Sequence, residues 1–416
     1  MTISISGNTS RRVSTDVKIA SLSLEPLRIP FRVSFKHASA ERNVTQSVLV
    51  IARSDDGLRG YGEGCPRDYV TGETDASVVA FFERHRVDLI AKAIDLPTLE
   101  EWRQGHERDI DENPAAWCAI ELALLDLFAR QNKQPVEALL GMPLLAGPFG
   151  YTAVLGAIRA AQFDDTLGRY QKLGLRDYKI KLSGDSGRDR ANLAILKSAG
   201  IAPEQVRADA NNLWSDRKVA QYYLESLDYP FAAIEEPLRP GRFADLVVLA
   251  ESLATRIVLD ESITRENQLS QLPGAPARWI VNLRVSKMGG LLRSLSVTNR
   301  CREMGLALVV GAQVGETSLL TRAALIVAQA AGDIVIGQEG AFGTMLLESD
   351  AVQPTLMFGA NGELDIDSLQ LDQSPGFGLV PAPDLAKRYF KHKAGEGVRR
   401  DWRACAACAK HANERR

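Results

Sequence analysis

The feature of this sequence that most constrains its fold is a strand and helix pattern that repeats about every 25 residues through the middle of the chain. Short β-rich runs alternate with helical stretches, and one polar residue stands at the end of each of five successive runs: Lys181, Asp209, Glu235, Asp260 and Arg284. These residues are 28, 26, 25 and 24 positions apart. One earlier run at 151–157 and two later runs at 307–313 and 333–339 bring the number of predicted strands to eight. Eight evenly spaced βα units predict an α/β fold, a modified (β/α)₈ barrel of the TIM type, rather than an open doubly wound sheet.

The segments on either side of the repeat predict further parts of the chain. Residues 17–145 begin with strand-like runs joined by an Asp-Asp-Gly turn and continue with helical spacing, so we expect an α+β capping domain. We expect residues 146–346 to form the barrel domain with the active site. Residues 347–390 contain Gly- and Pro-rich turns and are expected to return and pack on the capping domain. The polar ends, 1–16 and 391–416, are expected to be a disordered tail and a polar appendage.

Composition and the positions of His and Cys exclude several classes of function. Lys and Arg number 50 and Asp and Glu 52, so the net charge of −2 gives no field that would attract nucleic acid or an anionic membrane. No His lies between His106 and His392, which excludes a Ser-His-Asp triad or a His-ligated zinc within the barrel. Five scattered Cys, no signal peptide and no apolar run of about 18 residues predict a cytoplasmic protein without a membrane partner.

Polar residues at the carboxyl ends of barrel strands should meet at one mouth of the barrel. Asp209, Glu235 and Asp260 would supply three hard oxygen ligands, which suit Mg²⁺, with Mn²⁺ as an alternative. Lys179 and Lys181 lie two residues apart on one strand, so both ammonium groups should point to the same side. Two lysines beside such a metal suit removal of the proton next to a carboxylate: the metal stabilises the enediolate and burial lowers the pKa of a lysine.

Each of these residues alone has a more ordinary explanation. A single Asp at a strand end is more often a helix N-cap, and a Lys-x-Lys pair is more often exposed at a sheet edge. The joint pattern favours a site, because the acids occur in successive repeats.

With these residues the sequence resembles the enolase superfamily. Within that superfamily it is most similar to the muconate lactonizing enzyme subgroup of the mandelate racemase/muconate lactonizing enzyme family. The resemblance extends over about residues 17–380. It rests on YKIK at 178–181, DAN at 209–211, IEEP at 234–237, DES at 260–262, the K-x-G-G tail at 287–290 and GAQVGETS at 311–318. It implies a capping domain whose two loops close the pocket, here around Phe31–Asn43 and Cys65–Glu73, the second being like the loop of dipeptide epimerases.

The resemblance also implies a role for individual residues. Lys181 would be the acid/base and Lys179 would help to hold the substrate carboxylate, while Asp209, Glu235 and Asp260 would bind Mg²⁺. Asn211 and Glu261 would support these ligands from behind, and Tyr69, Glu316 and Glu339 are candidate substrate contacts. The resemblance further implies a homo-oligomer, a dimer or an octamer.

Two departures from the family pattern bear on the reaction. Arg284 stands where the subgroup has a second acid/base lysine, and arginine stays protonated, so we expect it to stabilise charge or to bind a second carboxylate. Lys287 lies three residues further on, and strand alternation would turn it away from the side of Arg284. On strand eight Glu339 stands without the Asp-x-Asp of dipeptide epimerases, which disfavours an α-amino dipeptide as substrate.

The sequence therefore predicts a Mg²⁺-dependent isomerase of a small carboxylate, either a cycloisomerase or a racemase or epimerase of a carboxylate or amino-acid derivative. A lyase that eliminates water on one face needs just one base and is the first alternative. A non-catalytic carboxylate-binding relative is the second.

Cys405, Cys408 and His411 have a metal- or redox-like spacing, although a basic tail of this kind is more often inert.

Overall fold

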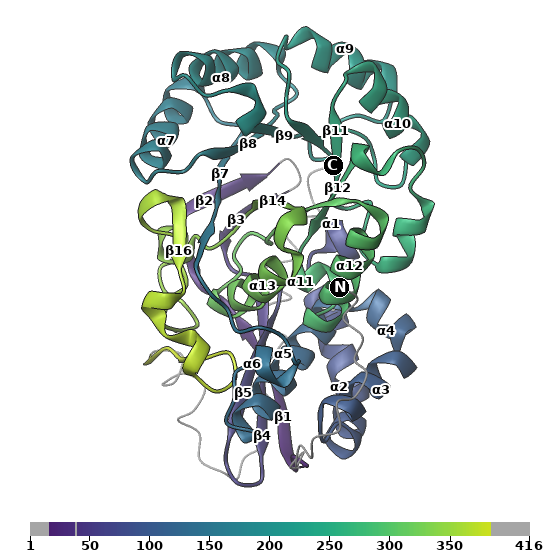
Figure 1. Cartoon of the computed structure of the whole chain (residues 1–416), viewed down its shortest axis with the longest axis vertical. Coiled ribbons are helices and arrows are strands. Elements are labelled where there is room, and N and C mark those ends of the chain that lie inside the picture. The colour runs from purple at the N-terminus through teal and green to yellow at the C-terminus, as the bar shows by residue number, and fades with distance from the viewer. Residues whose placement is uncertain (1–15, 38–39, 384–416) are drawn as a thin grey trace, which may run out of the picture. The chain divides into compact units, whose positions relative to one another are not determined.

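The computed structural model describes residues 16–37 and 40–383 (Figure 1). The chain divides into two units between Val380 and Pro381, and the sheets and the site described below belong to the first. The tail predicted for 1–16 and the Cys405/Cys408 segment lie, apart from Asp16, outside the described residues.

The N-terminal part contains five strands followed by six helices. Their bounds are β1 (Ile19–Leu27), β2 (Pro30–His37), β3 (Ala40–Val44), β4 (Ser47–Ser54), β5 (Arg59–Gly64), α1 (Asp68–Thr71), α2 (Asp75–Lys92), α3 (Leu96–Gly105), α4 (Glu107–Glu112), α5 (Pro114–Gln131) and α6 (Val136–Leu139). Strands β1, β4 and β5 form an antiparallel sheet in the order β1-β4-β5, and the predicted Asp-Asp-Gly turn joins β4 to β5. Strands β2 and β3 form a separate hairpin.

Helix α5 lies directly on β5 because every second residue of this part of the strand is a glycine: Gly60, Gly62 and Gly64. A Cβ atom would come within 2.1 Å of the Ala123 carbonyl oxygen at Gly60, and within 2.2 Å of the Ala119 oxygen at Gly62. Alternate residues of a strand share one face, so a side chain at any of these positions would push the helix away. The glycines thus allow this apolar helix to pack against the sheet without a gap.

The remaining elements alternate strand and helix as the 25-residue repeat predicts. Their bounds are β6 (Pro148–Gly150), β7 (Thr152–Leu155), α7 (Ala160–Lys172), β8 (Asp177–Lys181), α8 (Ser186–Ser198), β9 (Val206–Asp209), α9 (Arg217–Ser226), β10 (Ala233–Glu235), α10 (Phe243–Ser252), β11 (Arg256–Leu259), β12 (Trp279–Leu283), α11 (Val285–Met288), α12 (Leu291–Met304), β13 (Ala307–Val310), α13 (Ser318–Ala331), β14 (Val335–Gln338), β15 (Val352–Gln353), β16 (Glu363–Asp365) and β17 (Val380–Pro381). Short 3₁₀ turns join several of them.

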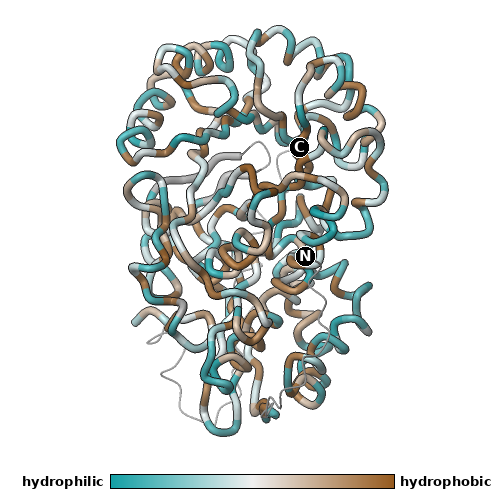
Figure 2. Tube along the Cα trace, viewed as in Figure 1, coloured by the Kyte–Doolittle hydropathy of each residue, from teal (hydrophilic) through white to brown (hydrophobic). Residues whose placement is uncertain are grey.

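Strands β7 to β14 form one parallel sheet in chain order, so the predicted fold class is confirmed: a nearly closed eight-stranded barrel with an N-terminal α+β domain. Across the join between its first and last strands, Gln338 Nε2 donates a hydrogen bond to the Tyr151 hydroxyl at 3.0 Å. Fully buried Ala233, Val258 and Ile280 are part of the barrel core. The outer helices α7 to α10 mix hydrophilic and hydrophobic residues, as expected for helices with one buried face (Figure 2).

The segment after the barrel hydrogen-bonds to the N-terminal domain near α5. Gly376 exchanges backbone hydrogen bonds with Gln134 and Val136, and Arg130 donates to the Leu379 carbonyl oxygen at 2.6 Å. The exact domain boundaries stay predictions.

No helix among the described residues is long and apolar enough to cross a membrane. A cytoplasmic location and a homo-oligomer stay predictions of the sequence.

Candidate active site

Three carboxylates stand side by side at the carboxyl ends of adjacent barrel strands. Asp209 ends β9 and Glu235 ends β10, and the two are paired in register, while Asp260 follows the last residue of β11. Each is at most 1% exposed. The structure therefore brings together the three predicted ligands, as expected from the parallel strand order.

A cationic side chain stands at each end of this row. Lys181 Nζ lies 3.0 Å from Asp209 Oδ2 and 3.0 Å from Asn211 Oδ1. At the other end Arg284 forms an ion pair with Asp260 through Nη2 and donates from Nη1 to Gln313 Oε1 at 3.0 Å. Because β9 and β11 flank β10, Lys181 and Arg284 lie on opposite flanks of Glu235.

Lys179 occupies the centre of the site. Its Nζ lies 2.6 Å from Glu339 Oε2, 3.2 Å from Glu235 Oε2 and 3.6 Å from Asp209 Oδ2. Burial alone would lower the pKa of Lys179, but the carboxylates of Glu235, Glu339 and Asp209 outweigh burial and raise it above its usual value. The expectation of a lowered pKa is therefore wrong for this lysine, because the charges of three acids outweigh burial.

Lys287 approaches the row from behind, contrary to the argument from strand alternation. The chain leaves the strand after Leu283, and Lys287 belongs to the short helix α11, so the alternation of a strand does not apply. Its Nζ donates to Asp260 Oδ1 at 2.9 Å and to the Asn282 carbonyl oxygen at 2.6 Å. Lys287 is 1% exposed and does not line the cavity, so it holds Asp260 in place rather than facing a ligand.

Burial and charge also shift the pKa values of the neighbouring acids. Burial raises the pKa of Glu235 to about 8; Lys179 opposes this shift and the nearby Asp209 adds to it. Burial and then the Asp260 carboxylate raise the pKa of Glu261 to about 7. The pKa of Arg284 is raised although burial opposes this, because Asp260, Glu261 and Glu235 favour the cation. Crowded buried carboxylates of this kind are typical of sites that bind cations.

Four polar residues that the sequence analysis missed complete the network. Asn282 Nδ2 donates to Glu235 Oε1 at 2.9 Å, and Gln313 holds Arg284. Arg207 binds Asp177 at 2.7 Å, and its Nη1 lies 3.6 Å from Glu339 Oε1. Glu236 accepts hydrogen bonds from the backbone nitrogens of Asp260 and Ser262 at 2.8 and 2.7 Å. Arg207 and Asn282 stand two positions before Asp209 and Arg284, so strand periodicity was a signal for both.

Backbone strain marks the same strand ends. Asn211 and Glu236 have φ values of +47° and +35°, in the left-handed region that most residues avoid. Such conformations persist where surrounding contacts hold them, and they cluster at functional sites. Here the Asn211 nitrogen donates to Asp209 Oδ1 at 3.0 Å, which fixes the orientation of that carboxylate.

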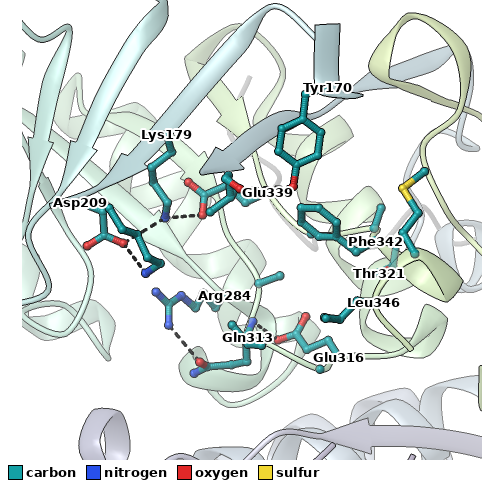
Figure 3. A pocket seen from close by; sticks show the side chains of 18 of the residues that line it. Tyr170, Lys179, Asp209, Arg284, Gln313, Glu316, Thr321, Glu339, Phe342 and Leu346 are labelled. Atoms are coloured by element: carbon teal, nitrogen blue, oxygen red, sulfur yellow. Dashed lines mark hydrogen bonds and ion pairs between the residues drawn. The ribbon is translucent and has the colours of Figure 1, made fainter. Parts of the chain in front are cut away.

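These groups open into a cavity of about 510 Å³ (Figure 3). All the predicted substrate contacts, Tyr69, Glu316 and Glu339, line it, and so do Lys179, Lys181, Asp209 and Arg284. Asn211 and Glu261 line the cavity as well. Of the three expected ligands, Glu235 and Asp260 lie beneath the cavity lining.

Arg67 links the predicted loop Cys65–Glu73 to the segment that lines the cavity after β13. Its guanidinium donates to the Gln46 carbonyl oxygen at 3.0 Å and to the Val314 carbonyl oxygen at 2.6 Å, and the residue is almost fully buried. This contact places Tyr69 at the cavity. Of the other predicted loop, Phe31–Asn43, the side chains from 33 to 42 lie outside the described set.

The donor set of Asp209, Glu235 and Asp260 fits a hard divalent cation in its chemistry, since it offers only carboxylate oxygens and all three acids are buried together. In the structure these acids form ion pairs with four basic side chains: Lys181, Lys179, Arg284 and Lys287. Among the described residues, no three His, Cys, Asp or Glu side chains are arranged so that they would hold a metal ion as they stand.

Comparison with known proteins agrees with this fold. Residues 15–141 match the N-terminal domain of the mandelate racemase / muconate lactonizing enzyme family, and residues 162–385 match the enolase C-terminal domain-like family. Since the second match alone covers more than half of the chain, the protein belongs to the mandelate racemase/muconate lactonizing enzyme family of the enolase superfamily.

The relatives include several isomerases and also an o-succinylbenzoate synthase of Listeria innocua. The chain is 26% identical to muconate cycloisomerase 1 of Rhodococcus opacus, over 91% of this chain and 100% of the relative. It is 27% identical to the L-Lys-D/L-Arg epimerase of Methylococcus capsulatus, over 85% of this chain and 96% of the relative. The crystal structure of the Methylococcus capsulatus dipeptide epimerase with Mg and the dipeptide L-Arg-D-Lys superposes with a TM-score of 0.73 at 26% identity, covering 87% of this chain and 99% of that one.

Proposed function

We propose that this protein is a Mg²⁺-dependent isomerase in which Lys181 transfers the α-proton of a small carboxylate substrate on one face. The observation that carries the proposal is the row of three buried carboxylates with Lys181 at one end and Arg284 at the other, opening into a cavity of about 510 Å³. Isomerase relatives of both the cycloisomerase and the epimerase kind support the general class.

Asp209, Glu235 and Asp260 would hold the metal, with Mn²⁺ as an alternative to Mg²⁺. A divalent cation bound there supplies positive charge that stabilises the enediolate form of the substrate. Lys179, fixed between Glu235 and Glu339, helps to orient the substrate carboxylate. The burial of all these groups excludes water and strengthens their electrostatic effect.

Lys181 is the residue that exchanges a proton with the substrate. Its Nζ lies at the cavity surface, held by Asp209 and Asn211. A positioned base of this kind contributes about 10²–10⁴-fold to the rate.

Arg284 gives the opposite flank a permanent cation instead of a base. Its guanidinium is bound by Asp260 and Gln313 and stabilises negative charge that develops on the substrate. A cycloisomerisation needs proton transfer on one face alone: Lys181 takes the α-proton as the bond from the β-carbon to an internal carboxylate oxygen breaks and a carbon–carbon double bond forms, or gives the proton in the reverse direction. An inversion of configuration needs a donor on the second face, so racemisation is disfavoured.

The same observation favours one alternative. A lyase that eliminates a group from the face of Lys181 also needs a single acid/base, and Arg284 would stabilise the charge in the same way.

The proposal is tested by proton exchange in D₂O. The protein is incubated with Mg²⁺ and a panel of N-acyl L-amino acids, and α-deuterium incorporation and optical rotation are followed by NMR and polarimetry. We expect exchange with retention in the wild-type protein, loss of at least about 10²-fold in Lys181→Met, and no change in the control Lys218→Met, which alters an exposed lysine on α9. Release of a leaving group with formation of a double bond between the α- and β-carbons, seen by NMR, would identify the lyase. Binding of these carboxylates without exchange would favour a non-catalytic relative and contradict the proposal.

A further inference from the structure

The cavity has two chemically different ends. Figure 3 shows Asp209, Lys179 and Arg284 on one side, while Tyr170, Phe342 and Leu346 lie on the other. The second end is formed by six half-buried apolar side chains, which we name the apolar compartment: Val154, Tyr170, Leu173, Phe342, Met345 and Leu346.

The apolar compartment presents ring faces and alkyl groups to a ligand. The Tyr170 hydroxyl donates to the Val154 carbonyl oxygen at 3.3 Å, so its polar atom is bound within the protein. The ring of Phe342 lies 6.5 Å from that of Tyr170 and packs edge-on against Phe358 at 5.3 Å between centroids, which fixes it in place. Rigid aromatic walls of this kind favour the binding of apolar groups, because apolar surface of the ligand and of the wall is removed from water.

Four polar side chains also line this region, and none provides a buried cation: Arg169, Thr166, Thr321 and Glu316, whose carboxyl group lies beside Leu346 (Figure 3). Arg169 is exposed, and its guanidinium lies 3.1 Å from Thr166 Oγ1 and 3.5 Å from Asp165 Oδ2, so its charge is met at the surface. Thr166 and Thr321 are uncharged. An anionic group placed in this compartment would lose its hydration without a buried cation as a partner, which is unfavourable.

The geometry points to a monocarboxylate substrate whose distal end is an uncharged apolar group, an aryl or branched alkyl group that fills the apolar compartment while the carboxylate lies at the charged end. This inference rests on the proposed function for the orientation of the substrate. It distinguishes the protein from an enzyme whose substrate carries a second carboxylate at the distal end.

The first test measures binding, which does not require turnover. Hexanoate and adipate have the same number of carbons and differ in whether the distal end is a methyl group or a carboxylate. With Mg²⁺ present, NMR titration should show hexanoate binding about tenfold or more tightly than adipate. In the series butanoate, hexanoate and octanoate, the dissociation constant should fall by up to about fourfold per added CH₂. Equal or tighter binding of adipate by the wild-type protein overturns the inference, and loss of that binding in Arg169→Gln would assign it to Arg169.

Two variants test whether the preference for hexanoate over adipate arises in the apolar compartment. Leu346→Lys adds a cation there and should reverse the order, so that adipate binds more tightly than hexanoate. The control Val248→Lys adds the same charge on α10, where Val248 is 43% exposed, and should leave the order unchanged. An unchanged order in both variants would show that the preference arises elsewhere and overturn the inference.

Deuterium exchange separates this inference from the proposed function. Exchange of N-benzoyl but not N-succinyl amino acids supports both. Exchange confined to N-succinyl derivatives keeps the proposed function and refutes the apolar compartment as the subsite. Tight hexanoate binding without exchange of any acid keeps the compartment and refutes the proposed reaction.

Discussion

Glu63 gives the most quantitative prediction, because it is a fully buried carboxyl group that joins the N-terminal domain to the barrel. It lies on β5 and accepts hydrogen bonds from the backbone nitrogen of Thr317 at 3.1 and 3.2 Å and from its hydroxyl at 2.6 Å. Thr317 is the N-cap of α13 and directly follows the residues that line the cavity. Burial raises the pKa of Glu63 from 4.5 to about 8, and the nearby Glu316 adds to this although Thr317 opposes it.

The sign of the pH dependence follows from where the proton is held. Below pH 4.5 both the folded and the unfolded chain keep the proton on Glu63, so the group causes no pH dependence there. Between pH 4.5 and about 8 the unfolded chain releases the proton while the folded chain retains it, so this group lowers the free energy of unfolding as pH rises. The slope is about 1.4 kcal/mol per pH unit, and the whole window amounts to about 5 kcal/mol.

Glu63→Gln removes this titration while keeping the size of the side chain. At pH 5 the free energies of unfolding of the variant and the wild-type protein should differ by no more than about 1 kcal/mol, because the side chain at position 63 is uncharged in both folded proteins. From pH 5.5 to 7.5 the variant should gain on the wild-type protein by about 1.4 kcal/mol per pH unit. Urea unfolding followed by circular dichroism at pH 5, 5.5, 6.5 and 7.5 measures this difference. A difference that does not change with pH would refute the reasoning, because it would mean that Glu63 titrates alike in both states.

The remaining predictions concern the active site. Arg284→Lys places an ionisable amine on the second flank; we expect α-deuterium exchange to occur with racemisation, detected by polarimetry in D₂O, whereas unchanged retention would show that Arg284 does not stand on the opposite face. Mg²⁺ at about 100 times its dissociation constant should stabilise the wild-type protein by about 2.7 kcal/mol, and EDTA should reverse this. Glu235→Gln should abolish the Mg²⁺ shift in thermal unfolding, and an equal shift in this variant would exclude Glu235 as a ligand.

The residues that the repeat predicted share one property: each stands at or near the end of a predicted parallel strand. Asp209, Glu235 and Asp260 followed from the repeat alone, because neighbouring parallel strands bring their carboxyl ends to one edge. Lys179 and Lys181 followed from the two-residue period of a strand. For these residues the position within the strand is enough to predict where the side chain lies in the folded protein.

What could not be predicted depends on contacts between distant strands or on where a strand stops. The pairing of Lys179 with Glu339 joins β8 to β14, six strands apart in the order of the sheet, and exists only because the sheet curves into a barrel. Lys287 was misplaced because the strand ends at Leu283 and a helical turn follows. The apolar compartment combines residues of β7 and of α7 and its C-terminal end with the segment after β14, and no spacing in the sequence relates them.

Arg284 explains why the second flank of this site differs from the first in more than charge. Asp260 is held by two cations, Arg284 from the cavity and Lys287 from behind, and Arg284 also binds Gln313. A lysine has one nitrogen at the end of a flexible chain and does not present two separated nitrogens to these two partners, whereas the planar guanidinium does. The arginine is therefore both a fixed positive charge and a link between the carboxylate row and the wall that contains Gln313 and Glu316. Lys181 is held by one carboxylate and one amide, and this lighter fixation suits the residue that exchanges a proton with the substrate. The asymmetry of the reaction that we propose thus follows from how each cation is bound, and not only from which one is able to lose a proton.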